Sequence, residues 1–155
     1  MTGSPSLFLI DTNVLVYAYD PSDAAKRDQA IRLLKSIAAR GLGAVSAQIL
    51  GEFFMAVTKK LAVPLTAAEA ERSVINYARA WTTLDLTAFT VQEATRGAQR
   101  HRMSYWDSLV WATAKLNQIP NVLSEDFSDR AVLEGVRFLN PFADSFDLDR
   151  LVAIR

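Results

Sequence analysis

Residues 7–20 read LFLIDTNVLVYAYD, in which the apolar run LFLI ends at an aspartate and a second apolar segment follows. A short apolar run that stops at a polar residue is typical of a buried strand in an α/β fold. We therefore predict a strand over 7–10 and a helix soon after it. Asp11 then lies at the carboxyl end of the strand.

The same alternation continues along the whole chain. Further strands are predicted over residues 43–46, about 83–86, 121–124 and 136–140. Helices are predicted over 22–40, from near 46 to before Pro64, from 66 to about 81, from about 87 to 101, and from 104 to about 117. This order predicts an α/β, three-layer fold with a mostly parallel five-stranded sheet flanked by helices.

Several helix ends carry recognisable signals. Ser22 is a candidate N-cap and Gly41 a stop signal for the first long helix. Thr66 and Glu69 have the spacing of a capping box. We interpret residues 1–155 as a single domain, with 143–155 as a C-terminal extension that packs as a closing helix, assists a dimer contact or stays mobile.

Composition narrows the function classes. The chain has 155 residues, half of them apolar, which suffices for one core. Because it has no cysteine, disulfides and thiolate zinc sites are excluded. The N-terminal segment lacks a basic signal-peptide region, and no run approaches the roughly 20 apolar residues of a membrane helix. We expect a soluble, cytoplasmic protein with no membrane contact.

The net charge of the chain does not indicate nucleic-acid binding. Seventeen basic and 17 acidic side chains cancel, so the chain lacks the overall positive charge of many nucleic-acid-binding proteins. Any nucleic acid must therefore be held by local cationic groups or by metal ions. Balanced charge also permits self-association.

Four acids are expected at one edge of the predicted sheet. Asp11, Glu52 and Asp126 each follow a strand directly or lie in the first turns of the next helix. Asp107 lies at the start of a helix that must return the chain to the strand at 121–124. Because the carboxyl ends of parallel strands form the binding crevice of such sheets, all four carboxylates should converge there.

Crowded carboxylates need compensation. Two unit charges about 4 Å apart repel by on the order of 4 kcal/mol at an effective dielectric constant near 20. A hard divalent cation such as Mg²⁺ or Mn²⁺ offsets that repulsion when several oxygens meet. Such a cation can activate water for phosphodiester hydrolysis. The sequence therefore predicts a metal-dependent hydrolase that holds one or two ions.

These motifs resemble the PIN-domain family, and within it the ribonuclease toxins of the VapC type. The first acid of the family resembles Asp11 in IDTNVLVYAYD, and the second resembles Glu52 in SAQILGEFF. The third resembles Asp107 in SYWDSLVWATA, and the fourth resembles Asp126 in VLSEDF. The ending VRFLNPF is similar to the last strand of the family.

The resemblance covers almost the whole chain and carries several implications. It implies endonucleolytic cleavage of RNA, such as tRNA or another structured RNA, by Mg²⁺ or Mn²⁺ with water as nucleophile. It places Asp11, Glu52, Asp107 and Asp126 in the metal site, with Thr12, Asn13 and Ser124 in supporting roles. It also implies a homodimer and a cognate antitoxin that blocks the site.

Simpler structural roles are also possible for these acids. Asp11 and Asp107 can simply cap helices, and Glu52 can simply face water. Asp129 is the reserve for Asp126, because both lie in the turn-like SEDFSD.

The basic and aromatic candidates have simpler readings too. Arg100 and Arg102 are candidate contacts to RNA phosphates, whereas we attribute Lys59 and Lys60 to the helix dipole. Trp106 and Trp111 lie at core-like helical positions, and we assign neither to binding.

Two other functions remain open. An aspartyl-phosphate phosphatase would use a strand-end aspartate as nucleophile, but its pattern requires an acid two residues later, where this chain has Asn13. A non-catalytic PIN-like module that binds RNA or protein would use the acids only as caps.

Overall fold

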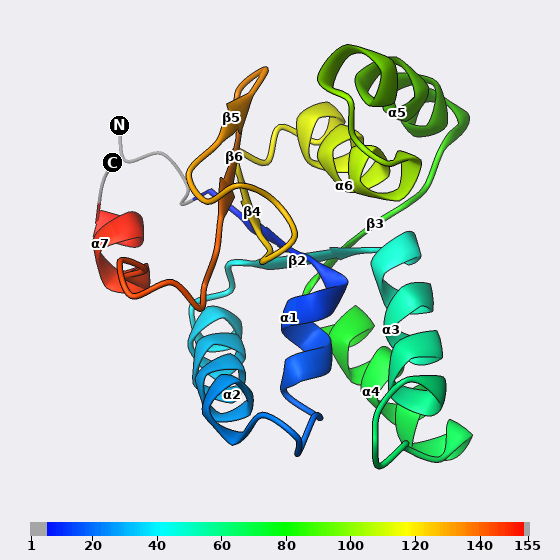
Figure 1. Cartoon of the computed structure of the whole chain (residues 1–155), viewed down its shortest axis with the longest axis vertical. Coiled ribbons are helices and arrows are strands. Elements are labelled where there is room, and N and C mark those ends of the chain that lie inside the picture. Colours follow the sequence, from blue (N-terminus) through cyan, green and yellow to red (C-terminus); the bar gives the residue numbers. More distant parts are fainter. Residues whose placement is uncertain (1–5, 154–155) are drawn as a thin grey trace.

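The predicted first strand forms β1 (Phe8–Ile10), which is fully buried in the middle of the sheet. In the computed structural model, which describes residues 6–153, the sheet has six strands in the order β3-β2-β1-β4-β6-β5 (Figure 1). Residues 1–5 and the last two residues of the predicted extension, 154–155, lie outside the described part.

Five of the six strands run parallel, as the sequence predicts. They are β1, β2 (Gly43–Ser46), β3 (Thr82–Leu84), β4 (Asn121–Leu123) and β6 (Val136–Leu139). Leu9 is aligned with Ala44 on one side and with Val122 on the other. The α/β fold with a mostly parallel sheet is therefore confirmed.

The predicted count of five strands is one short. β5 (Val132–Leu133) pairs antiparallel with β6 through a tight hairpin at Glu134 and Gly135. Both turn residues have positive φ, 48° and 87°. Such a two-residue hairpin usually has Asn-Gly or Asp-Gly at the turn, and the Glu-Gly pair here lacks that signal. A strand of two residues is also too short to show the alternation of apolar and polar residues from which strands are predicted.

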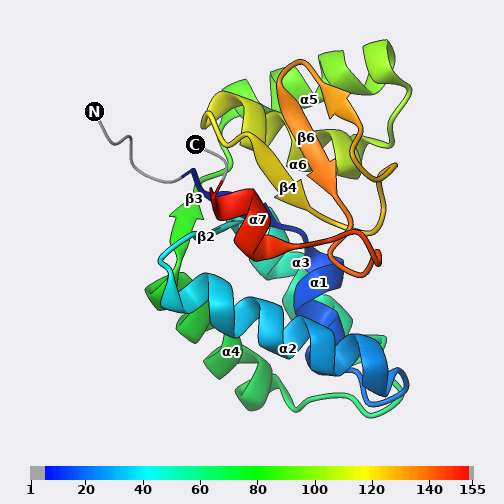
Figure 2. The same ribbon diagram turned by 90° about the vertical axis from the view of Figure 1, so that its left-hand side faces the viewer.

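Helices cover both faces of the sheet. α1 (Thr12–Tyr17), α2 (Ala24–Ala39), α3 (Ala47–Lys59) and α4 (Ala67–Ala80) lie on one face, whereas α5 (Ala88–His101) and α6 (Tyr105–Leu116) lie on the other (Figures 1 and 2). The chain adds β2 and β3 on one side of β1 and returns to add β4 on the other. β1 and β4 therefore flank a topological switch point, where α/β sheets bind ligands.

The C-terminal extension ends in a short helix. α7 (Leu148–Ala153) lies beside α2, and Leu148, Leu151 and Val152 pack against the core (Figure 2). Of the three readings of the extension, the structure supports the closing helix. Among the described residues, no helix has both the length and the apolar character needed to cross a bilayer.

Most helix-end signals act as expected. Thr66 and Glu69 form a reciprocal capping box at α4, and Ser46 caps α3 by accepting from Ile49 N at 3.1 Å. The Ser22 prediction is wrong: Asp23 caps α2, because its carboxylate accepts from Lys26 N at 3.0 Å, whereas the Ser22 hydroxyl bonds Asp20. Gly41 follows the end of α2 with a φ of 65°.

α5 packs closely on α6 through a glycine. A Cβ added at Gly97 would lie 2.3 Å from a ring carbon of Trp111 and 2.7 Å from Ser108 Oγ. The Trp111 side chain is fully buried, so the core reading of this residue is confirmed. Its Nε1 donates to Leu133 O at 3.1 Å, which ties α6 to β5. This packing fixes the direction of α6 and thereby the place of Asp107.

Candidate active site

Asp11 leaves the buried end of β1 and has two roles at once. Its side chain is only 4% exposed. Oδ1 accepts from Thr12 N at 2.8 Å and so caps α1, whereas Oδ2 accepts from Ser124 Oγ at 2.7 Å. The capping interpretation is therefore correct but incomplete, because the second oxygen is turned toward the end of β4.

Asn13 connects the two strand ends. Its Nδ2 lies 3.3 Å from Asp11 Oδ2, 3.1 Å from Ser124 Oγ and 3.0 Å from Asp126 Oδ2. Its Oδ1 accepts from Glu125 N at 3.2 Å. One neutral amide thus bridges the first and the last of the predicted acids.

Glu52 reaches the same place from α3. Its Oε2 accepts from Thr12 Oγ1 at 3.0 Å, and its Oε1 accepts from Gln48 Nε2 at 2.8 Å. Glu52 is half-buried and does not simply face water. Thr12 therefore links the carboxylate of Glu52 to the turn that carries Asp11.

Asp107 approaches from the start of α6. Ser104 caps that helix by accepting from Asp107 N at 3.2 Å. Burial raises the pKa of Asp107, a hydrogen bond with Ser104 opposes the rise, and the charges of Asp126 and Glu52 add to it. Asp107 thus shares an electrostatic environment with two acids that are distant in sequence.

The pKa of Asp11 is strongly raised. Burial raises its pKa to about 6, against hydrogen bonds from Ser124 and Thr12 that lower it. The charges of Asp126 and Glu52 raise it further. An ionised Asp11 is therefore costly in the protein alone, which is the condition that a bound cation relieves.

The chemistry of these donors suits a hard divalent cation. Four carboxylates and the Ser124 hydroxyl supply only oxygen, the ligand type that Mg²⁺ and Mn²⁺ prefer. As the side chains lie, no three acidic or imidazole groups within residues 6–153 stand close enough to hold one ion together. Binding would therefore require the carboxylates to move toward each other. Glu52 is half-buried and Asp126 is exposed, so both can change rotamer, and a bound ion would then replace their hydrogen bonds with Thr12, Gln48 and Asn13.

A groove of about 690 Å³ opens beside the acids. Its walls include Thr12, Asn13, Tyr17, Glu52, Met55, Lys60, Trp106 and Asp126. Trp106 is 61% exposed and Met55 is 55% exposed. The core interpretation of Trp106 is therefore wrong, because the first turn of α6 presents this residue to the groove.

The remaining candidates lie elsewhere. Asp129 Oδ1 accepts from Asn140 N at 2.8 Å and lines a different cavity, so the structure does not bring this reserve acid to the other four. Arg100 and Arg102 are exposed at the end of α5, and neither lines the groove. Lys60 does line it, although we attributed this lysine to the helix dipole.

Sequence reasoning missed two groups beside the acids. Gln48 Nε2 donates to Glu52 Oε1 and also approaches Trp106 O at 3.3 Å, which joins α3 to α6. Its position four residues before Glu52, one helical turn away, is a signal that could have identified it. Trp106 had no such signal, because its helical spacing is also that of a core residue.

The PIN domain family model matches residues 8–132. VapC20 of Mycobacterium tuberculosis, described as a toxin that cleaves the sarcin-ricin loop, superposes with a TM-score of 0.65 at 23% identity over 84% of this chain and 98% of its own. A toxin-antitoxin complex from Klebsiella pneumoniae gives 0.64 at 18% identity, with 86% and 97% covered. DNA-bound VapBC from Salmonella typhimurium gives 0.60 at 14%, with 86% and 96% covered.

At these identities the solved structures establish a shared fold. No curated protein sequence matches the chain significantly. The family model, in contrast, spans β1 to β5 and includes all four predicted acids together with their supporting residues. The chain belongs to the PIN domain family.

Proposed function

We propose that the protein is a Mg²⁺- or Mn²⁺-dependent endoribonuclease, the toxin of a toxin-antitoxin pair. One observation carries the proposal: Asn13 holds Asp11 and Asp126 together at the switch point of the sheet, where Glu52 and Asp107 also arrive. The cap that Asp11 forms at α1 does not require three other acids nearby. In addition to burial, the charges of Asp126 and Glu52 raise the pKa values of Asp11 and Asp107, so the convergence of the four is unfavourable in the protein alone.

The side chains divide the work between them. Asp11, Glu52, Asp107 and Asp126 would hold one or two cations, and Thr12, Asn13 and Ser124 orient three of these carboxylates. A bound Mg²⁺ or Mn²⁺ lowers the pKa of water and offsets charge that develops on a phosphate. Gln48 keeps Glu52 directed toward the site. No cysteine or histidine nucleophile is required, since water attacks the phosphorus.

RNA is the substrate that the groove suits best. The exposed Trp106 ring offers a stacking surface for an unpaired base, and Lys60 offers a cation for the backbone. The similar toxin from Mycobacterium tuberculosis is described as cleaving an RNA loop, which supports a structured RNA as the target here. The nearly neutral chain thus meets RNA through local groups rather than through overall charge.

Two protein partners belong to the proposal. Several similar structures are toxin-antitoxin complexes, which supports a cognate antitoxin for this chain. The proposal also includes a homodimer, which the VapC resemblance implies, and a cytoplasmic location, which a chain without cysteine suits. Size-exclusion chromatography with light scattering tests the dimer: a mass of one chain at micromolar concentration would exclude it.

The phosphatase alternative loses support from Asn13. The position that such an enzyme needs as an acid is an amide that donates toward Asp11, Ser124 and Asp126. A non-catalytic module remains testable by Mn²⁺ titration of the purified protein. Saturable binding that is lost in Asp11→Asn favours the nuclease, and absent binding favours the module.

The decisive experiment is incubation of the protein with total cellular RNA, with and without EDTA, followed by mapping of the cut ends. We expect discrete cuts that require the divalent cation and disappear in Asp107→Asn. Glu71→Gln, at an exposed position on α4, is the matched control and should cleave normally. Cleavage that persists in EDTA or in Asp107→Asn, with contaminating nuclease excluded, would remove the basis of the proposal.

A further inference from the structure

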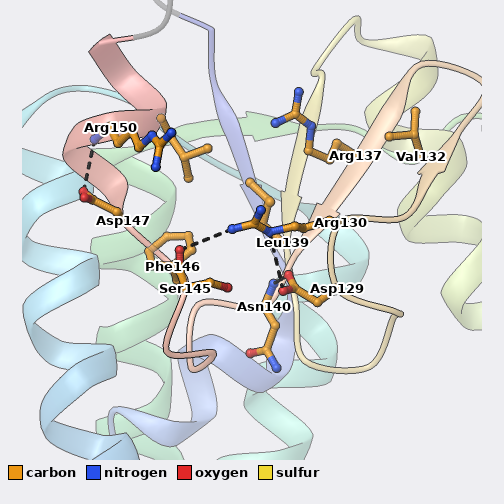
Figure 3. A pocket seen from close by; sticks show the side chains of 11 residues that line it. Asp129, Arg130, Val132, Arg137, Leu139, Asn140, Ser145, Phe146, Asp147 and Arg150 are labelled. Carbon is orange, nitrogen blue, oxygen red and sulfur yellow. Dashed lines mark hydrogen bonds and ion pairs between the residues drawn. The ribbon is translucent and has the colours of Figure 1, made fainter.

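A second cavity lies between α7 and the β6 strand, away from the acids (Figure 3). Its volume is about 420 Å³, and it shares no lining residue with the groove beside the acids. Of its lining residues, only Asp129, Arg130 and Val132 fall within the segment that the PIN family model matches. The cavity is therefore largely a product of the C-terminal part of this chain.

Three arginines from different elements face this cavity. Arg130 comes from the segment before β5, Arg137 from β6 and Arg150 from α7, and Figure 3 shows their guanidinium groups directed into the space between α7 and β6. Arg130 donates to Ser145 O at 3.4 Å and lies 4.0 Å from Asp129. Among residues 6–153, Arg137 and Arg150 form no ion pair.

The two acids of the cavity are occupied by backbone groups. Asp129 Oδ1 accepts from Asn140 N at 2.8 Å, and Asp147 Oδ1 accepts from Arg150 N at 3.1 Å at the start of α7. Asp147 points away from the guanidinium groups (Figure 3). The three arginines thus outnumber the two aspartates of the cavity, and both aspartates already accept hydrogen bonds from backbone groups.

The remaining walls combine apolar side chains with the polar residues Asn140 and Ser145. Leu139 lies two residues after Arg137 and so shares its face of the strand, and Phe146 and Leu151 complete the opposite side. Guanidinium groups match the oxygens of a phosphate in pairs, and an aromatic ring can stack on a base. A cavity of this volume falls within the usual range for small-molecule sites.

We propose that this cavity binds a nucleotide, with its phosphate between Arg130, Arg137 and Arg150 and its base against Phe146. The proposal is independent of RNA cleavage, because it uses none of the acids. An RNA strand is the competing occupant of the same cations. A volume typical of small-molecule sites and the apolar side chains opposite the arginines favour the small ligand.

The test is calorimetric titration of the whole protein in EDTA with AMP, inorganic pyrophosphate or adenosine. In EDTA the uncompensated acids repel phosphate, so binding reports on the arginines. We expect saturable binding of AMP and none of adenosine. Arg137→Gln and Arg150→Gln should each weaken AMP binding by roughly tenfold. Arg79→Gln, an equal charge change on exposed α4, should leave it unchanged.

Each other outcome overturns the proposal. No saturable AMP binding removes the site, and equal affinity in the arginine variants and in Arg79→Gln places binding elsewhere. If pyrophosphate binds as tightly as AMP, the base contributes nothing to binding, and its proposed contact with Phe146 is excluded. A 5′-phosphorylated RNA that binds through Arg137 while AMP does not assigns the arginines to RNA. Melting curves of the variants check folding, and Arg137→Lys, which keeps the charge, serves where Arg137→Gln does not fold.

Discussion

Asp11 shows how one residue can serve both fold and site. One of its oxygens caps α1, and the other faces Ser124, Asn13 and the charge of Asp126. Replacement by a neutral isostere keeps the acceptor for Thr12 N but removes the charge. Structure and proposed catalysis therefore respond to this change in opposite directions.

For Asp11→Asn we expect loss of RNA cleavage and a higher melting temperature in EDTA. The gain follows from removal of a desolvated charge beside two other acids, and about 1 kcal/mol would raise the melting temperature by about 3 °C. Added Mg²⁺ should stabilise the wild type but not the variant. Calorimetry in both buffers checks this, and a lower melting temperature of the variant in EDTA would contradict it.

Trp106 is both exposed and part of the groove wall, which favours a contact with RNA. Stacking of one base on an aromatic ring is worth roughly 1–3 kcal/mol, so Trp106→Ala should weaken binding of single-stranded RNA about tenfold or more. Anisotropy of a labelled RNA in the Asp11→Asn background measures binding without cleavage. Phe89→Ala is the control, since Phe89 is 75% exposed and lies outside the groove. Equal losses in both variants would exclude a specific stack.

At the level of elements, α5 packs so closely on α6 that a single added carbon atom at Gly97 would disturb the contact. Gly97→Ala would place a methyl group against the buried Trp111 ring and Ser108 Oγ. We expect destabilisation of roughly 1–3 kcal/mol, which is typical of overpacked cores. Reduced RNA cleavage should accompany it, because α6 carries Asp107.

The matched control for that change is Gly51→Ala on α3, where an added Cβ meets nothing within 4 Å. Alanine favours a helix over glycine, so this variant should gain roughly 0.5–1 kcal/mol. Urea unfolding of both variants gives the comparison. If Gly97→Ala proves as stable as the wild type, the packing of these two helices is looser than described.

The elements also show what a sequence can and cannot predict. The sequence predicts one sheet edge for Asp11, Glu52 and Asp126, because each follows a strand or lies in the first turns of the next helix. Thr12 and Asn13 link these three residues in the structure. The same edge is predicted for Asp107 because α6 must return the chain to the start of β4. Trp106 could not be placed, because helical spacing does not reveal where a helix extends beyond the sheet. The cavity beside α7 depends on how the C-terminal segment folds back, which no local pattern encodes.

At the scale of the whole molecule, an ionic cluster ties α5 and α6 to the β5-β6 hairpin. Lys115 Nζ lies 2.6 Å from Glu93 Oε1, and Arg96 and His101 both contact Glu134, at 2.9 and 2.7 Å. Hydrogen bonds from Arg96 and then Lys115 lower the pKa of Glu93 to about 2. Hydrogen bonds from His101 and then Arg96 lower that of Glu134 to about 2.

These two acids should make the protein sensitive to low pH. Their folded-state pKa lies below the unfolded value, so their contribution is complete above about pH 4.5 and is lost as the pH falls toward 2. The Glu93→Gln/Glu134→Gln double variant should be about 1 kcal/mol less stable than the wild type at pH 6, and nearly equal to it near pH 2. Urea unfolding at both values measures the difference, and Glu71→Gln is the control. If the two proteins differ in free energy of unfolding by the same amount at pH 6 and at pH 2, these acids do not cause the pH dependence.

The two margins of the sheet are both very short. β3 has three residues and β5 has two, and Val132 on β5 is 59% exposed. An incoming peptide that extended the sheet would find few free backbone groups to pair with, and short edge strands are a common defence against such pairing. A second polypeptide that recognises this protein would therefore gain more from contacts with side chains than from pairing with a sheet edge, so its specificity would depend on sequence rather than on backbone complementarity.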